Sequence, residues 1–171
     1  MNFTDLHRRL LRDLLEVGSD FPLVITGGYA VQAHGLVDRA SRDLDVATQS
    51  PISMDAIVSA VETGLTARGW TVRQVESDPL SARLIAADAE GRECEVDILK
   101  EAFWLPPLQT DYGPVLALDD VIGTKVRALA DRGAVRDLID VHAISQIRTS
   151  AEMEALGAGM PAMTSVSRIW E

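Results

Sequence analysis

The sequence contains a single cysteine, Cys94, among its 171 residues. One thiol excludes an internal disulfide, and the three scattered histidines show no Cys/His spacing typical of a zinc site. The chain must therefore be held together by a hydrophobic core, which a domain of this length can form. A lone cysteine also fits a reducing compartment, so we expect a cytoplasmic protein.

Basic residues are scarce as well. Lysine and arginine number 16 against 26 aspartates and glutamates, which gives a formal net charge of −10. Such a surface repels nucleic acid unless a local basic patch overrides it. The balance argues against bulk DNA binding. It is compatible with an enzyme that holds a nucleotide through metal ions or touches RNA over a small area.

Long apolar runs are missing too. The longest uncharged run, residues 21–37, contains one proline, three glycines, Gln32 and His34, and is too short and polar for a membrane span. Asp13 and Glu16 interrupt the apolar part of the N-terminal helix pattern, unlike in a signal peptide. We therefore expect a soluble protein without a membrane partner.

The apolar spacing predicts helices and strands in mixed order. Helices are expected at 4–17, after Gly27-Gly28 as far as Gly35, and at 52–69, 118–132 and 135–147; strands are expected at 21–26, 43–48, 70–75, 81–88 and 92–99. This order predicts an α+β (mixed α/β) fold, with a small mixed sheet, helices on one side and further helices at the C-terminus. Disorder is expected only after about Thr149, where glycines and a proline break a weak periodicity.

Two aspartates, Asp43 and Asp45, open the expected strand 43–48. Alternate residues of a strand share a face, so both carboxylates lie together while Leu44 points into the core. Two neighbouring negative charges need solvent, a basic partner or a cation to compensate them. An Asp-x-Asp pair by itself is more often a solvated strand edge than a metal site.

A third carboxylate joins the pair if strand 92–99 neighbours strand 43–48. Asp97 is the expected member, with Glu95 as the alternative. Three carboxylates from two adjacent strands suit hard cations such as Mg²⁺. Two such ions can clamp the attacking and leaving oxygens of a phosphoryl transfer.

Two glycines, Gly27 and Gly28, stand between the expected strand 21–26 and the helix that follows it. Glycines there let backbone N–H groups approach a phosphate, whose charge the start of a helix favours. A Gly-Gly pair alone is more often only a tight turn. The combination of this pair with Asp43, Asp45 and Asp97 later in the sequence is hard to explain by packing alone.

These residues resemble the nucleotidyltransferase motif of the polymerase-β-like superfamily, and more narrowly the AbiEii/AbiGii toxin-type (MenT-like) nucleotidyltransferases. Gly28 stands where the superfamily more often has serine, although Gly-Gly is usual in the AbiEii-like branch. The resemblance covers about residues 21–147. It rests on Gly27, Gly28, Ala30, Gly35, Arg39, Ser41, Asp43 and Asp45, and downstream on Lys125, Arg132 and an Arg-Asp-x-x-Asp segment ending at Asp140.

The resemblance implies a Mg²⁺-dependent enzyme that moves a nucleoside monophosphate from a nucleoside triphosphate (NTP) to an acceptor hydroxyl. The implied acceptor is a tRNA 3′ end, and the implied role is the toxin of a toxin–antitoxin pair with a cognate antitoxin. A small-molecule or protein acceptor, and a catalytically silent nucleotide-binding or interaction module, are the alternatives. The expected organisation is a nucleotidyltransferase core at 1–112 and a C-terminal helical segment at 113–171 packed on it.

The resemblance also implies roles for single residues. The implied catalytic residues are Asp43, Asp45, Asp97 and Asp137; the implied ligands of two Mg²⁺ ions are Asp43, Asp45 and Asp97; the implied NTP contacts are Gly27, Gly28, Ser41 and Lys125. Asp140 is a second candidate beside Asp137, and either can be structural, paired with Arg132 or Arg136.

Lys125 lies in the middle of the apolar arc of the expected helix 118–132. A lysine is rarely buried without a partner. Its ammonium either contacts triphosphate, which the motif favours, or neutralises Asp137, or reaches solvent while its stem packs.

Overall fold

The structure is a computed structural model that describes residues 1–159. The chain divides into two compact units, Met1–Ala117 and Leu118–Glu171. The first unit extends to Ala117, whereas the sequence placed the boundary after residue 112. The reason is that Gly113–Val115 forms a strand that pairs with the sheet of the first unit.

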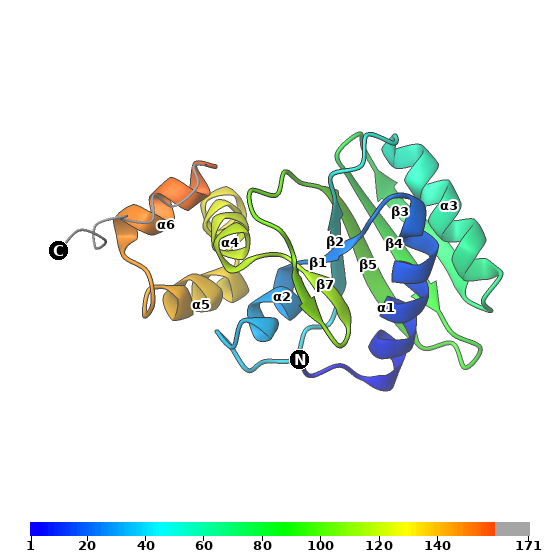
Figure 1. Ribbon diagram of the computed structural model, residues 1–171. Helices are drawn as coiled ribbons and strands as arrows, with labels where there is room; N and C mark the ends of the chain where they lie inside the picture. Colours follow the sequence, from blue (N-terminus) through cyan, green and yellow to red (C-terminus); the bar gives the residue numbers. More distant parts are fainter. Residues whose placement is uncertain (160–171) are drawn as a thin grey trace. The chain divides into compact units, whose positions relative to one another are not determined.

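The first unit consists of a mixed β-sheet with flanking helices (Figure 1). Its helices are α1 (Asp5–Val17), the short 3₁₀ helix η1 (Gly18–Asp20), α2 (Gly27–Ala33) and α3 (Met54–Thr66). Its strands are β1 (Val24–Ile25), β2 (Leu44–Thr48), β3 (Thr71–Ser77), β4 (Ser81–Ala87), β5 (Glu93–Lys100), β6 (Leu108–Thr110) and β7 (Gly113–Val115). They form one seven-stranded sheet in the order β3-β4-β5-β2-β1-β7-β6.

The two strands at the centre of the sheet carry the predicted carboxylates. β2 and β5 run parallel, and their register places Asp45 directly opposite Asp97. β1 pairs antiparallel with β2, and β4 pairs antiparallel with β5. The expected adjacency of strands 43–48 and 92–99 is therefore confirmed.

Alternation along the central strands separates a core face from a polar face. Leu44, Val46, Leu84, Val96 and Ile98 are all buried. Helix α3 packs along β3 and β4, and α1 packs against α3, so their apolar sides close the core. The residues between the buried ones, among them Asp45 and Asp97, lie on the opposite face.

Three helices make up the described part of the second unit: α4 (Leu118–Arg132), α5 (Val135–Ile144) and α6 (Ser150–Gly157). Both α5 and α6 pack against α4. A Cβ on Gly123 would lie 2.7 Å from the backbone oxygen of Leu156, so this glycine permits the close approach of α4 and α6.

Helix α6 corrects the expectation of disorder after Thr149. The Thr149 side chain accepts from the Glu152 backbone N–H, and the Glu152 carboxylate accepts from the Thr149 N–H, which forms a capping box. This local signal outweighs the weak apolar periodicity. The rest of the expected disordered stretch, from residue 160 onward, lies outside the described residues.

Within residues 1–159, none of the helices is both long enough and apolar enough to cross a membrane.

Candidate active site

The candidate site begins where β1 ends and α2 starts. Gly27 has a φ of +58°, a left-handed conformation that side chains disfavour. A Cβ at residue 27 would lie 1.9 Å from Oδ2 of Asp45, so any side chain there would collide with that carboxylate. The Thr26 N–H also donates to the Asp45 backbone oxygen at 2.9 Å. The glycine turn and the Asp45 carboxylate thus lie in direct contact.

The absence of a side chain at Gly28 makes room for the side chain of Ser41. A Cβ at residue 28 would lie 2.7 Å from Oγ of Ser41 and 3.8 Å from Nη1 of Arg39. The Ser41 hydroxyl therefore occupies the space that a side chain at residue 28 would enter. This packing gives a physical reason for Gly-Gly in place of Gly-Ser.

Asp43 and Asp45 lie at the beginning of β2. Asp43 directly precedes the strand and Asp45 is its second residue, both partly exposed on either side of the buried Leu44. The thiol of Cys94 is buried near both carboxylates. Burial is the main reason why its pKa rises to about 12, and the negative charges of Asp43 and Asp45 also raise it. Cys94 therefore stays protonated and is no nucleophile.

A buried pair of side chains, His7 and Tyr29, packs behind the Asp43 segment. Nδ1 of His7 lies 2.5 Å from Oη of Tyr29, and the Tyr29 hydroxyl donates to the Ser41 carbonyl at 3.5 Å. The Phe3 ring stacks on Tyr29 with centroids 3.9 Å apart. Burial lowers the pKa of His7 against the opposing charge of Asp43, so the imidazole is neutral near pH 7. These contacts connect α1 and α2 to the segment that carries Asp43.

Asp97 lies beside Asp45 but is engaged by an arginine. Nε of Arg83 is 2.8 Å from Oδ1 of Asp97, and Nη2 of Arg83 is 2.9 Å from Oδ2. The same Nε is 3.1 Å from Oε1 of Glu95. Both candidates for the third carboxylate therefore contact one guanidinium.

The donor chemistry fits a divalent cation at Asp43 and Asp45. Carboxylate oxygens are the ligands that Mg²⁺ prefers, and the absence of a side chain at Gly27 lets the Asp45 carboxylate lie directly against the turn. A third ligand is not in place: among residues 1–159, no three His, Cys, Asp or Glu side chains converge so that they could hold a metal. Asp97 does not join Asp43 and Asp45 because both of its carboxylate oxygens accept hydrogen bonds from Arg83.

The second unit holds the downstream motif residues in buried ion pairs. Nζ of Lys125 is 2.9 Å from Oδ2 of Asp140 and 4.0 Å from Oδ1 of Asp137. Arg132 forms a two-point contact with Asp137 at 2.7 and 2.9 Å. The Arg132 hydrogen bonds lower the pKa of Asp137, so this fully buried carboxylate stays ionised.

Lys125 is thus paired within its own unit, and Asp140 lies closer to its ammonium than Asp137 does. The pairing of Asp137 with Arg132 is one of the two alternatives that the sequence left open for this carboxylate. These contacts define the structural surroundings of Lys125 and Asp137. Their proposed contacts with phosphate and their role in catalysis stay predictions.

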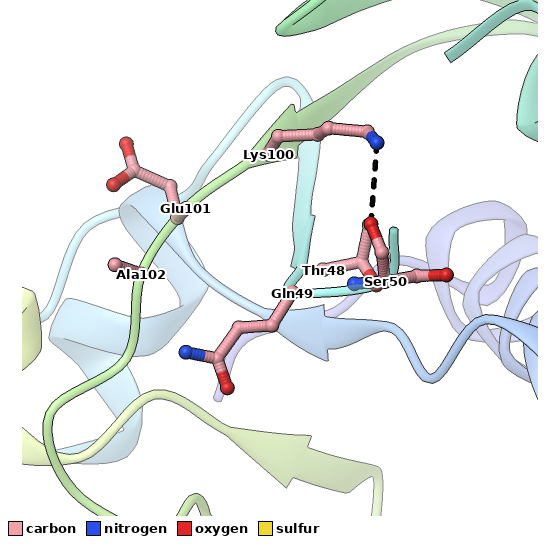
Figure 2. Close-up of a pocket in the computed structure, with 6 residues that line it drawn as sticks. All are labelled: Thr48, Gln49, Ser50, Lys100, Glu101 and Ala102. Carbon is pink, nitrogen blue, oxygen red and sulfur yellow. Dashed lines mark hydrogen bonds between the residues drawn. The ribbon is translucent and has the colours of Figure 1, made fainter. Parts of the chain in front are cut away.

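A hollow of about 330 Å³ lies at the other end of β2, lined by Thr48, Gln49, Ser50, Lys100, Glu101 and Ala102 (Figure 2). Figure 2 shows the Lys100 ammonium directed at the Ser50 carbonyl, to which it donates at 3.2 Å. It also donates to the carbonyl of Ile52. Lys100 therefore fastens the segment between β2 and α3, at the end of the strand opposite to Asp43.

Arg83 and the His7–Tyr29 pair were not predicted from the sequence. Arg83 stands between the buried Ala82 and Leu84, a pattern that places it on the polar face, but its partner depends on which strand lies next to β4. His7 lies on the buried side of α1, where the periodicity predicts only that it packs. No local signal in the sequence connects it to Tyr29.

The sequence model of the AbiEii nucleotidyl transferase toxins, a family of type IV toxin–antitoxin systems, matches residues 9–160. The chain belongs to this family. The AbiEii-family chain is accordingly a nucleotidyltransferase, which confirms the family and the enzyme class expected from the Gly-Gly and Asp-x-Asp motifs. A search of curated proteins found no match.

Two solved structures share the fold of this AbiEii-family chain. JHP933 from Helicobacter pylori is 19% identical, with a TM-score of 0.61 over 85% of this chain and 68% of that chain. MenT4, a nucleotidyltransferase toxin from Mycobacterium tuberculosis, is 20% identical, with a TM-score of 0.59 over 87% of this chain and 62% of that one. At these identities the similarity concerns the fold, and it confirms the expected α+β nucleotidyltransferase architecture.

Proposed function

We propose that this chain moves a nucleoside monophosphate from an NTP to the 3′ hydroxyl of a tRNA. The observation that carries the proposal is the direct contact between the Gly27 turn and the Asp45 carboxylate, with Asp43 on the same short segment. Family membership supplies the reaction class. The contact supplies a place where a phosphate chain and carboxylates can meet.

The phosphates of the NTP lie, in this proposal, against Gly27 and Gly28. The absence of side chains there lets backbone N–H groups approach phosphate oxygens closely. Ser41 donates its hydroxyl to a phosphate oxygen, because its Oγ lies where a side chain at residue 28 would point. The acceptor hydroxyl releases its proton to solvent as its oxygen bonds to the α-phosphorus, the bond from the α-phosphorus to the bridging oxygen breaks, and pyrophosphate leaves with that oxygen.

Asp43 and Asp45 are the proposed ligands of Mg²⁺. Bound there, the ion supplies neutralisation of phosphate charge. The chain itself supplies position: β2 fixes both carboxylates on one segment, and the Thr26–Asp45 backbone hydrogen bond fixes that segment against the glycine turn. Holding the reactants in place accounts for much of the catalysis in phosphoryl transfer.

Lys125 and Asp137 enter the proposal through the family motif. Lys125 is the proposed phosphate contact and Asp137 the proposed second-motif catalytic residue. Their buried ion pairs support a competing structural role, so the two roles need separate measurements of stability and of nucleotide affinity. We also propose that the chain acts in the cytoplasm as the toxin of a pair whose antitoxin silences it.

The acceptor is tested with each α-³²P-labelled NTP, Mg²⁺ and total tRNA. We expect label on tRNA from the wild type and none from Asp43→Asn or Asp45→Asn. Asp111→Asn, an exposed aspartate of the β6–β7 turn, is the matched control and should retain activity. Label on a small molecule or a protein would replace tRNA as the acceptor. NTP binding without any transfer would indicate a catalytically silent module.

A further inference from the structure

A row of charged side chains crosses four neighbouring strands on the polar face of the sheet. Asp45 on β2 lies opposite Asp97 on β5, and Asp97 lies opposite Arg83 on β4. Arg83 in turn lies opposite Glu76 on β3. Side chains directly opposite one another in paired strands share a face and lie within contact range. Arg83 is therefore the cation of this four-residue row, one strand beyond the candidate third metal ligand.

Arg83 engages both oxygens of Asp97, at 2.8 and 2.9 Å, in the two-point geometry that makes arginine–carboxylate pairs strong. The hydrogen bonds that Arg83 donates to Asp97, together with the charges of Asp97, Glu95 and Glu76, raise the pKa of Arg83, so the guanidinium keeps its charge. A cation that approaches Asp97 would compete for the same oxygens and be repelled by the arginine. In this arrangement Asp97 is a poor metal ligand.

The guanidinium has other partners within reach. Its Nε lies 3.1 Å from a Glu95 oxygen, and its Nη1 lies 3.7 Å from a Glu76 oxygen. The Arg83 side chain is 36% exposed, so it can shift without opening the core. Loss of the Asp97 contact would thus leave the arginine paired with two glutamates on neighbouring strands.

We propose that Arg83 gates the third carboxylate of the site. With Arg83 on Asp97, divalent cations bind through Asp43 and Asp45. Recruitment of Asp97 as a further ligand requires the guanidinium to move onto Glu95 and Glu76. Arg83 thereby sets the affinity of the site for divalent cations. This inference rests on the proposed function, because it requires that Asp43 and Asp45 take such a cation.

The gate is tested by titrating Mn²⁺ into the nucleotide-free protein and measuring free Mn²⁺ by EPR. Arg83→Gln should bind Mn²⁺ roughly tenfold more tightly than the matched control Arg73→Gln, because it gains one charged ligand. Arg73 is an exposed arginine on β3 that lies opposite Ile85, two residues along β4 from Arg83, so its loss removes the same charge from the same face. Adding Asp97→Asn to Arg83→Gln should abolish the gain.

Arg83→Lys provides a second variant should the glutamine variant fail to fold. It keeps the charge but loses the two-point contact, and we expect Mn²⁺ affinity between those of the wild type and Arg83→Gln. Equal affinities of the Arg83 variants and Arg73→Gln would overturn the gate. So would a gain in Mn²⁺ affinity that persists after Asp97→Asn.

The Asp43→Asn variant separates this inference from the proposed function. If Asp43→Asn loses Mn²⁺ binding while Arg83→Gln gains none, the gate fails and the metal site stands. If the wild type and Asp43→Asn bind Mn²⁺ equally or not at all, the proposed function and the gate fail together.

Discussion

Residue 27 must be glycine for two reasons: its φ is left-handed, and the Asp45 carboxylate lies where a Cβ would stand. We predict that Gly27→Ala costs about 1–3 kcal/mol of unfolding free energy, from left-handed strain and from displacement of Asp45. Divalent-cation affinity should fall as well, since Asp45 moves. Chemical denaturation and cation titration measure the two effects.

Gly91→Ala is the matched control for this substitution. Gly91 also has a left-handed φ, +75°, but a Cβ there would meet nothing within 4 Å. Gly91→Ala should lower the unfolding free energy through the left-handed strain but leave the affinity for divalent cations unchanged. Equal behaviour of the two variants in the cation titration would contradict the proposed contact between the turn and the metal site.

His7 should make stability depend on pH. Burial lowers its folded-state pKa below the ordinary 6.5, so below that pH the unfolded chain binds a proton that the folded chain does not. The unfolding free energy should therefore fall as the pH drops from 7 to 5. In His7→Gln, which keeps a hydrogen-bonding group near Tyr29, the fall should be smaller. Parallel curves for the two proteins would exclude His7 as the titrating group.

The sequence predicted which strands bring the candidate carboxylates together, but not the contacts that these carboxylates make. Period-2 alternation placed Asp43 and Asp45 on one face, and the register of β2 and β5 bears out the approach of Asp97. The contact of Asp97 with Arg83 could not be predicted, because it depends on β4 lying between β3 and β5. A pattern within one strand contains no information about strand order.

At the scale of elements, α4 and α5 are joined by buried charges. Nζ of Lys125 is 2.9 Å from Asp140 in a setting where the lysine is 7% and the carboxylate 0% exposed. We predict that Lys125→Ala costs about 3–5 kcal/mol of unfolding free energy, since it removes one partner of a buried pair. Asp140→Asn in the same chain should recover much of that loss.

The same four proteins of this double-mutant cycle should be titrated with NTP. If Lys125 contacts phosphate, Lys125→Ala should lower NTP affinity about ten- to hundredfold whichever residue stands at position 140. Strong coupling in denaturation together with unchanged NTP affinity would leave Lys125 with a structural role.

The elements that the sequence missed have physical reasons. Strands β6 and β7 are three residues each, too short for a periodic signal, and Pro114 interrupts the second. Helix α6 was missed because its apolar periodicity is weak, although its Thr149–Glu152 capping box is a local signal that the sequence does contain. Long amphipathic elements such as α1 and α3 were predicted within a few residues.

For the molecule as a whole, divalent cations should couple to folding. A cation that binds only the folded chain adds about 2.7 kcal/mol at a hundredfold excess over its Kd. The Tm of the wild type should therefore rise with Mg²⁺, whereas that of Asp43→Asn should not. Without Mg²⁺ the variant should melt at the same temperature or higher, because it removes repulsion from Asp45. A wild-type Tm indifferent to Mg²⁺, with and without NTP, would favour a solvated strand edge.

The net charge of −10 limits the surface with which the protein could bind the proposed RNA acceptor. Nucleic-acid affinity that rests on many phosphate contacts falls steeply with salt. If the acceptor is a tRNA 3′ end, as proposed, the acidic surface predicts that the RNA is contacted only over a small area at that end. The same charge argument predicts that the protein does not bind DNA in bulk.

The most direct test of nucleotidyl transfer compares the position of the label in the NTP. With the accepted NTP labelled at the α-phosphate, the wild type should transfer label to the acceptor and release one pyrophosphate for each label transferred. With the γ-phosphate labelled, the acceptor should stay unlabelled. Asp45→Asn should neither transfer the α-label to the acceptor nor release pyrophosphate. Transfer of the γ-label, or equal α-label transfer by Asp45→Asn, would contradict nucleotidyl transfer at the Asp43–Asp45 site.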